Sequence, residues 1–334
     1  MFNNIIGQSA HKLAASNMIR AVRNGSPLQA LAITGERGAG KTKFLRAILD
    51  ELQSDVVIPE IKKNCLPRPN DIRGENRDYV RFEEFIESLL VELNSKKSVA
   101  IVFDEFHELP AGPNIAPLTY KHLFNLLMEM TILAKEGRAE KIQIGESFAT
   151  FDPKRHFVLV ASNYPDMINP ALLSRFRLMS LSVYSPEDLR KICLSKLEEC
   201  KLRVNDVEVV RPMVNLCRTS ARDVDTLVGE LKIVCGARNK KTVGIEDVRT
   251  AMKQLGLYPF GFNRDFVLAL ETCKDRSYSA KFVEEVFPSL KGSISREFSI
   301  AYQAGLTIKN GKGWHLTKHG KEALVTWRKD GFKW

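Results

Sequence analysis

The sequence has no closely spaced cysteine pair and no long apolar run. Its six cysteines are scattered over 334 residues, and none forms a Cys-x-x-Cys pair. This spacing disfavours a zinc site or a disulfide framework and favours a reducing compartment. No apolar stretch approaches the roughly 18–20 residues of a membrane span, and the N-terminus lacks the regions of a signal peptide. We therefore expect a cytoplasmic protein without a membrane partner.

Internal repeats and low-complexity tracts are also lacking, whereas basic residues are in excess. Lys and Arg number 50 against 40 Asp and Glu, so the formal net charge at pH 7 is +10. This excess favours nucleic acid or an acidic membrane surface as a partner, without requiring either. Hydrophobic residues make up 44% of the chain, enough for a sizeable core, and the length suits two or three domains.

Short apolar runs alternate with amphipathic segments in the first part of the chain, a pattern typical of a parallel α/β sheet. We expect buried strands over 31–34, 99–103 and 157–161, and a helix over 43–52. From Pro186 to about Met252 the apolar period is helical without a strand candidate, and Ser185 can cap the first helix. The predicted organisation is an α/β domain over 1–183, a helical lid over 184–256 and a third domain over 257–334.

A glycine-rich turn joins the first predicted strand to the predicted helix. Residues 35–42 fit the phosphate-loop pattern G-x-x-x-x-G-K-[ST], in which backbone N–H groups wrap a polyphosphate. Lys41 would meet the β- and γ-phosphates and Thr42 would meet Mg²⁺, at the positive end of the helix dipole. An accidental turn is the alternative, but the flanking strand and helix supply the context that the motif requires. ATP and Mg²⁺ are therefore the expected ligands, and the loop glycines are Gly35, Gly38 and Gly40.

Polar side chains follow the other two predicted strands. Asp104 and Glu105 come directly after five apolar residues, and Asn163 follows the third strand. Asp104 can join the Mg²⁺ shell, Glu105 can activate water and Asn163 can orient that water. Arg175, after a short helix, is a candidate to stabilise charge on the γ-phosphate of a neighbouring subunit. A surface acidic pair, a turn at Asn163 and a solvated arginine are the alternatives, and the presence of Glu105 favours hydrolysis over binding alone.

The C-terminal segment has the pattern of three helices followed by a hairpin. Asn263 and Ser279 can cap the first two helices, and the third runs from about Ser293 to a stop at Gly305. The dipeptide Asn310-Gly311 is a strong hairpin signal. Three helices and a hairpin predict a winged helix. The second helix is expected to present an apolar face of Phe282, Val283 and Val286.

The same segment is a candidate DNA-binding domain. Residues 263–334 contain 13 Lys and Arg against 8 Asp and Glu. Lys309 and Lys312 on the hairpin are candidate phosphate contacts, and Arg296 on the third helix is a weaker candidate. A winged helix that binds protein instead is the alternative. Three histidines far apart in sequence are interpreted as structural or surface residues, because they lack metal-ligand spacing: His107, His122 and His315.

The order of these motifs resembles the AAA+ ATPases, and more narrowly the RuvB family of Holliday-junction branch-migration motors. Residues 104–109 are similar to that family's Walker B motif, 2–8 to its adenine-side segment, and 142–146 to the hairpin that docks its junction-binding partner. The resemblance implies an AAA+ P-loop NTPase core with a parallel sheet, a small helical lid and a C-terminal winged helix. It also implies a ring, most simply a hexamer, because the ATP sites of this family are assembled between neighbouring subunits.

The resemblance implies further residue roles and partners. Ile5, Ile6 and Tyr184 would contact the adenine. Arg175 would be the trans-acting arginine finger and Arg222 the sensor 2 arginine of the lid. Implied partners are duplex or branched DNA, further copies of the chain, and a RuvA-like or other replication or recombination protein.

The sequence departs from the family at several positions. Ser162-Asn163 stands where threonines are usual, and Trp314 replaces a second wing arginine. The segment 59–79 makes the gap before Walker B longer and is a candidate DNA-facing loop or partner site. These departures fit a diverged, phage- or mobile-element-encoded relative as well as a housekeeping RuvB.

Three functions stay open from the sequence alone. The first is ATP-driven translocation or branch migration on duplex or junction DNA by a ring. The second is a DNA-bound AAA+ switch, such as a helicase loader, a replication initiator or a transposition regulator. The third is a protein remodeller that threads polypeptide, which would leave the winged helix and the basic excess unexplained.

Overall fold

The computed structural model describes residues 1–52, 56–58, 82–107, 117–218 and 220–329. The chain forms two compact units, Met1–Val183 and Tyr184–Trp334. The candidate partner site at 59–79 and the end of the Walker B stretch lie outside the described residues. Among the helices that are described, none combines the length and the apolar character needed to cross a bilayer.

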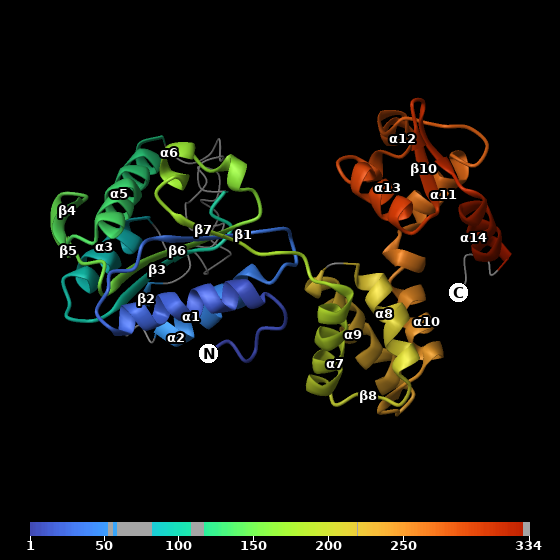
Figure 1. The fold of residues 1–334 in the computed structure, drawn as a ribbon, viewed down its shortest axis with the longest axis horizontal. Helices are drawn as coiled ribbons and strands as arrows, with labels where there is room; N and C mark the ends of the chain where they lie inside the picture. Colours follow the sequence, from blue (N-terminus) through green and yellow to red (C-terminus); the bar gives the residue numbers. More distant parts are fainter. Residues whose placement is uncertain (53–55, 59–81, 108–116, 219, 330–334) are drawn as a thin grey trace. The chain divides into compact units, whose positions relative to one another are not determined.

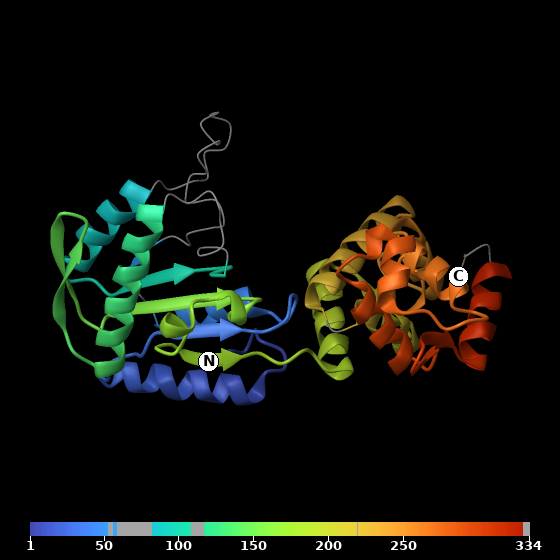
Figure 2. The same ribbon diagram turned by 90° about the horizontal axis from the view of Figure 1, so that it is seen from above.

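The first unit is built on a parallel sheet with the strand order β2-β3-β6-β1-β7, whose strands run side by side in one direction in Figure 2. Three strands match the predicted runs, and two edge strands were not predicted. Of the four β7 residues three are exposed, so this edge lacks the continuous apolar run that identified the central strands. The strands are β1 (Leu31–Thr34), β2 (Val56–Ile58), β3 (Val99–Phe103), β6 (His156–Ser162) and β7 (Arg177–Ser180).

Helices cover both faces of this sheet (Figure 1). Successive side chains of a strand point to opposite faces, so Leu31 and Ile33 pack with one pair of helices and Ala32 with the other. The central strands are buried at every position because helices cover both of their faces, and they are apolar apart from Thr34 in β1 and His156 and Ser162 in β6. One face is covered by α1 (Ser9–Arg23) and α2 (Lys41–Leu52), the other by α3 (Phe82–Leu93) and α5 (Pro117–Glu136).

A hairpin precedes β6. Strands β4 (Glu140–Ile144) and β5 (Ser147–Phe151) are antiparallel, and their inward side chains join the core under α3 and α5. Phe148 points outward and is 61% exposed. The hairpin expected from the resemblance around 142–146 is therefore present. Two short helical turns follow β6: η1 (Pro165–Met167) and α6 (Pro170–Leu173).

The second unit begins with helices. The predicted cap is confirmed: the Ser185 hydroxyl accepts from the Asp188 N–H at 3.1 Å, and the Asp188 carboxylate accepts from the Ser185 N–H at 3.3 Å. The expectation of no strand was wrong, because β8 (Arg203–Val204) pairs in parallel with β9 (Thr242–Val243). Two residues are too few to produce a recognisable strand pattern. The helices are α7 (Pro186–Glu199), α8 (Val210–Cys217), α9 (Ala221–Ala237) and α10 (Ile245–Gln254), with η2 (Val207–Val209) before α8.

The C-terminal part of this unit contains every element expected of a winged helix. The Asn263 and Ser279 caps are confirmed, at 2.8 and 3.2 Å from the N–H groups that they accept from. The expected apolar face of the second helix is buried only at Val283. The elements are η3 (Pro259–Gly261), α11 (Arg264–Thr272), α12 (Ala280–Val286), η4 (Pro288–Leu290), α13 (Ile294–Gln303), β10 (Thr307–Asn310), β11 (Gly313–Leu316) and α14 (Lys318–Lys329).

The other two residues of that face stay in contact with solvent. Phe282 is 39% and Val286 48% exposed. Phe282 stacks instead on Tyr278, with ring centroids 4.7 Å apart. Tyr278 in turn exchanges two backbone hydrogen bonds with Trp314 of β11, at 3.0 and 2.8 Å. This pairing attaches a third extended segment to the hairpin.

Candidate nucleotide site

The loop after β1 has a backbone that only glycine tolerates well. Gly35, Gly38 and Gly40 have φ of +145°, +84° and +86°. A Cβ on Gly35 would also lie 2.8 Å from the Leu181 carbonyl oxygen. Gly35 therefore allows the loop to pack closely against Leu181, and the positive φ values of Gly38 and Gly40 give the turned backbone in which N–H groups can bind a polyphosphate, so the residues present fit a bound nucleotide.

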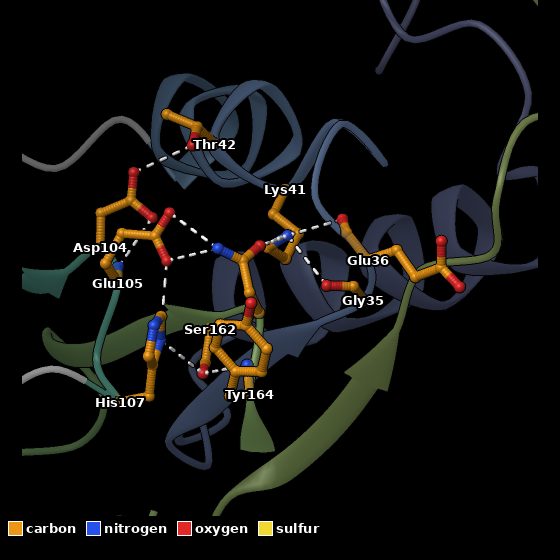
Figure 3. A network of polar contacts seen from close by, with 10 residues as sticks. Gly35, Glu36, Lys41, Thr42, Asp104, Glu105, His107, Ser162 and Tyr164 are labelled. Atoms are coloured by element: carbon orange, nitrogen blue, oxygen red, sulfur yellow. Dashed lines mark hydrogen bonds and ion pairs between the residues drawn. The ribbon is translucent and has the colours of Figure 1, made fainter. Parts of the chain in front are cut away.

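Lys41 begins α2, and its side chain is turned back into this loop (Figure 3). The residue is only 6% exposed. Its ammonium group donates to the carbonyl oxygens of Gly35 and Glu36, both at 2.9 Å, and to Oδ1 of Asn163. A buried ammonium requires such oxygen partners, and phosphate oxygens can take their place.

Thr42 and Asp104 meet on the other side of the loop. The Thr42 hydroxyl donates to Oδ2 of Asp104 at 2.9 Å, and Oδ1 accepts from the N–H of Glu105 at 3.0 Å. Among the described residues no group of three or more His, Cys, Asp or Glu side chains is arranged to hold a metal. A hydroxyl and one carboxylate still fit Mg²⁺, which takes its remaining ligands from substrate phosphates and water.

Asn163 connects the two halves of the site. Its Nδ2 donates to both carboxylate oxygens of Glu105, at 2.9 and 2.7 Å, while its Oδ1 accepts from Lys41. The sheet order explains this position, because β6 lies between β3 and β1 and their carboxyl ends share one edge. The structure thus brings five predicted residues together: Lys41, Thr42, Asp104, Glu105 and Asn163.

His107 is a neighbour of Glu105 that the sequence analysis did not place there. It is 5% exposed, and its Nδ1 lies 3.6 Å from a Glu105 carboxylate oxygen and 3.1 Å from the Ser162 hydroxyl. The ring of Tyr164 packs edge-on against it, with centroids 4.9 Å apart. Glu105 has a φ of +53°, and this turn of the backbone lets His107, two residues later, lie beside the Glu105 carboxylate. The spacing Glu-x-His after a buried strand was the available signal.

The predicted adenine-side segment is tied to the end of the first unit. The Gln8 side-chain amide donates to the Ser182 carbonyl oxygen at 2.5 Å and accepts from the Ser182 N–H at 3.2 Å. Ile5 is buried in the core cluster that includes residues of α1 and α2, and Ile6 is half-buried. Tyr184 follows two residues later and is buried at the start of the second unit, where burial and then Asp188 raise its pKa. The sequence analysis placed Gln8 in this segment but did not predict its contact with Ser182.

The two candidate arginines take no part in the hydrogen bonds described above for Lys41, Asn163 and Glu105. Arg175 is half-buried and donates to the carbonyl oxygen of Ala171 in the preceding helix. Its Nε is buried without a hydrogen-bond partner among the described residues. Arg222 is exposed on the first turn of α9 in the second unit. A role at a neighbouring subunit's site for Arg175, and a sensor role for Arg222, stay predictions.

The three candidate DNA contacts are all exposed: Lys309, Lys312 and Arg296. The Lys309 ammonium lies 5.5 Å from the centroid of the Trp314 ring. That ring stacks on Phe298 of α13, with centroids 5.0 Å apart and an interplanar angle of 3°. Trp314 therefore joins the hairpin to the third helix.

Residues 31–182 match the family of ATPases associated with various cellular activities (AAA). The chain is similar in structure to RuvB of Thermotoga maritima, a Holliday junction branch migration motor: the TM-score is 0.64 at 16% identity, over 96% of this chain and 95% of that chain. It is also similar to the AAA domain of FIGL-1 in complex with ADP, with a TM-score of 0.52 at 15% identity, over 81% and 88% of the chains. No curated protein matches the chain in sequence. The predicted AAA+ P-loop core and its RuvB-like fold are thereby confirmed.

Proposed function

We propose that this chain is a Mg²⁺-dependent ATPase that drives translocation or branch migration on duplex or junction DNA as a ring, most simply a hexamer. The observation that best supports ATP hydrolysis is that Lys41 and Glu105 are both hydrogen-bonded to the side-chain amide of Asn163. A residue that binds phosphate, a candidate base and a side chain able to orient water thus share one edge of the sheet.

Each of these side chains has a chemical task in the proposed reaction. Lys41 and the loop N–H groups bind the polyphosphate, and Thr42 and Asp104 hold Mg²⁺. When bound, that ion neutralises charge on the phosphate oxygens. Glu105 accepts a proton from the attacking water. Because Asn163 holds both Glu105 oxygens while it also contacts Lys41, a γ-phosphate that draws Lys41 and the amide toward itself would free the carboxylate for water.

The action on DNA rests on the C-terminal segment. Its elements are those of a winged helix, it carries 13 basic against 8 acidic residues, and its candidate contacts are exposed. The likeness to a branch-migration motor over nearly the whole chain supports the same assignment. In a ring, Arg175 would reach a neighbour's γ-phosphate, and the β4–β5 hairpin with Phe148 would dock a RuvA-like or other recombination protein.

The test is steady-state ATP turnover without DNA and with single-stranded, duplex and four-way-junction DNA, together with the oligomer mass in ATP. We expect stimulation by duplex or junction DNA in an assembly of ring size. A slow, DNA-indifferent ATPase that forms open filaments would instead favour an AAA+ switch such as a helicase loader, a replication initiator or a transposition regulator.

Glu105→Gln tests the hydrolytic assignment. The amide keeps the size of the side chain but cannot accept the proton, so nucleotide binding should persist while turnover falls by about 10²-fold or more. Glu146→Gln, in the exposed turn of the hairpin, is the matched control and should turn over ATP as the parent does. A fully active Glu105→Gln protein would show that this carboxylate is not the base.

A further inference from the structure

A largely buried ion pair joins two segments of the second unit. Arg218, between α8 and α9, donates from Nη1 and Nη2 to the two carboxylate oxygens of Glu297 on α13, both at 2.9 Å. The two side chains are only 12% and 13% exposed. Such a planar, two-point contact fixes direction as well as distance.

The same guanidinium group also holds the segment between the helices and the C-terminal part. Its Nε donates to the Phe260 carbonyl oxygen at 2.7 Å and its Nη2 to that of Gly261 at 2.6 Å. It also lies 5.3 Å from the ring centroid of Phe262. Gly261 permits this approach, because it has a φ of +67° and a Cβ there would meet the Leu216 carbonyl oxygen at 2.5 Å.

The two partners sit beside the candidate functional residues of their segments. Arg218 is four residues before Arg222, the candidate sensor of nucleotide state, and Glu297 follows Arg296 directly. Glu297 is the only acidic residue of α13. Its pairing leaves the exposed side of that helix without a carboxylate: Ser295, Arg296, Ser299, Tyr302 and Gln303. This face suits contact with a phosphate-rich duplex.

We propose that Arg218, the residue that ends α8, is a positioning residue that fixes the helical segment 184–256 and α13 as one body, so that nucleotide-dependent movement of this segment is delivered to the DNA-facing side of α13. This inference rests on the proposed DNA-dependent ATPase. The other ion pairs found among the described residues of the unit lie within the helical segment 184–256 and do not reach α13. Asp247, paired with Arg238 and Lys240, is buried. The remaining pairs are at the surface, as in Arg190–Glu187, where the side chains are 39% and 58% exposed. Exposed pairs of this kind contribute little rigidity.

The test uses three full-length variants. Arg218→Lys keeps the charge, but a single ammonium cannot hold two carboxylate oxygens and two carbonyl oxygens at once. Glu297→Gln leaves the contacts of Arg218 with the carbonyl oxygens in place and removes only the negative charge on α13. The inference can therefore still be tested with this variant if Arg218→Lys fails to fold. Arg190→Lys, in the exposed pair on α7, is the matched control.

The first readout is amide hydrogen exchange in α13 with and without a non-hydrolysable ATP analogue. In the parent and in Arg190→Lys, binding of the analogue should change exchange in both α9 and α13. In the two test variants, the analogue should still change the exchange rate of α9 as it does in the parent. The change in the exchange rate of α13 should be smaller than in the parent by about fivefold or more, which is the size of a typical coupling between sites. The inference is overturned if α13 of the parent does not respond, or if the variants transmit the change fully.

The second readout is ATP turnover with and without duplex DNA, alongside DNA affinity. The test variants should keep the basal turnover and DNA affinity of the parent while their stimulation by DNA falls by about fivefold or more. Full stimulation in Arg218→Lys would also overturn the inference. A parent enzyme that ignores DNA would instead refute the proposed function, and the exchange experiment would still decide whether Arg218 links the two helices.

Discussion

At the residue scale, His156 is a titratable group built into the core of the first unit. It begins β6 and is fully buried. Its Nδ1 accepts from the Asp152 N–H at 3.0 Å, and its Nε2 is buried without a hydrogen-bond partner among the described residues. Burial, and then the neighbouring Arg155 charge, lower its pKa to about 4 against an opposing effect of Asp152. The ring is therefore neutral in the folded protein near neutral pH.

This histidine should make the first unit sensitive to acid. The unfolded chain takes up a proton near pH 6.5, whereas the folded chain does so only near pH 4. The contribution of the neutral His156 ring to the free energy of unfolding is therefore complete above pH 6.5. As the pH falls from 6.5 toward 4, the free energy of unfolding decreases by about 2–3 kcal/mol because of this residue. We expect His156→Asn, which keeps an acceptor for the Asp152 N–H but does not titrate, to lose less stability over this range in urea unfolding.

The control is His122→Asn, which alters an exposed histidine of α5. It should follow the pH dependence of the parent protein. Equal acid sensitivity of His156→Asn and the parent would mean that His156 does not control this transition.

At the scale of elements, the β10–β11 hairpin contains a buried hydroxyl group without a hydrogen-bond partner among the described residues. Thr307 of β10 is 1% exposed, and its hydroxyl has no hydrogen-bond partner within the described part of the chain. Burying a hydroxyl without a partner is unfavourable. Thr307→Val keeps the shape and the strand preference, so it should raise the free energy of unfolding by about 1 kcal/mol. Denaturant unfolding measures this change.

Thr317, directly after β11, gives the opposite expectation for the same substitution. Its hydroxyl donates to the Gly305 carbonyl oxygen at 2.6 Å and accepts from the Gly320 N–H at 2.9 Å. Thr317→Val should therefore destabilise the protein by about 1 kcal/mol. Destabilisation by both substitutions would contradict the assignment of an unsatisfied hydroxyl to Thr307.

The same scale explains which elements the sequence predicted. Central strands β1, β3 and β6 are buried on both faces, so their apolar runs are continuous and were found. The edge strand β7 was missed because three of its four residues face solvent. The caps at Ser185, Asn263 and Ser279 were predicted correctly, because a cap depends on residues within one helical turn.

The candidate site was predictable only as far as its motifs are local. The phosphate loop is eight consecutive residues, and the acidic pair adjoins one strand. The interactions that organise the site join distant residues: Lys41 and Asn163 are 122 positions apart, and Gln8 and Ser182 are 174 apart. Arg218 and Glu297 are separated by 79. No local pattern encodes such pairs, because they depend on the sheet order and on how helices pack.

At the scale of the whole molecule, the excess of positive charge is unevenly distributed. Residues 263–334 hold 13 Lys and Arg against 8 Asp and Glu, half of the net charge of +10. If the hairpin contacts DNA phosphates, Lys309 and Lys312 release counterions on binding. Replacing both by Ala should weaken duplex binding and reduce the slope of log K against log salt by about 1 for each phosphate that a lysine neutralises. Titrations at several salt concentrations measure both quantities.

Two features of the chain make this experiment discriminating. Lys309 also lies over the Trp314 ring, so Lys312→Ala alone separates charge from packing on the hairpin. Lys191→Ala removes an exposed lysine of α7 and should leave the slope unchanged. If the double variant keeps the affinity and the slope of the parent, the hairpin does not contact DNA, and a winged helix that binds protein becomes the better assignment. A reduced slope with unchanged basal ATP turnover would place DNA binding in the second unit and leave hydrolysis to the loop and strand ends of the first.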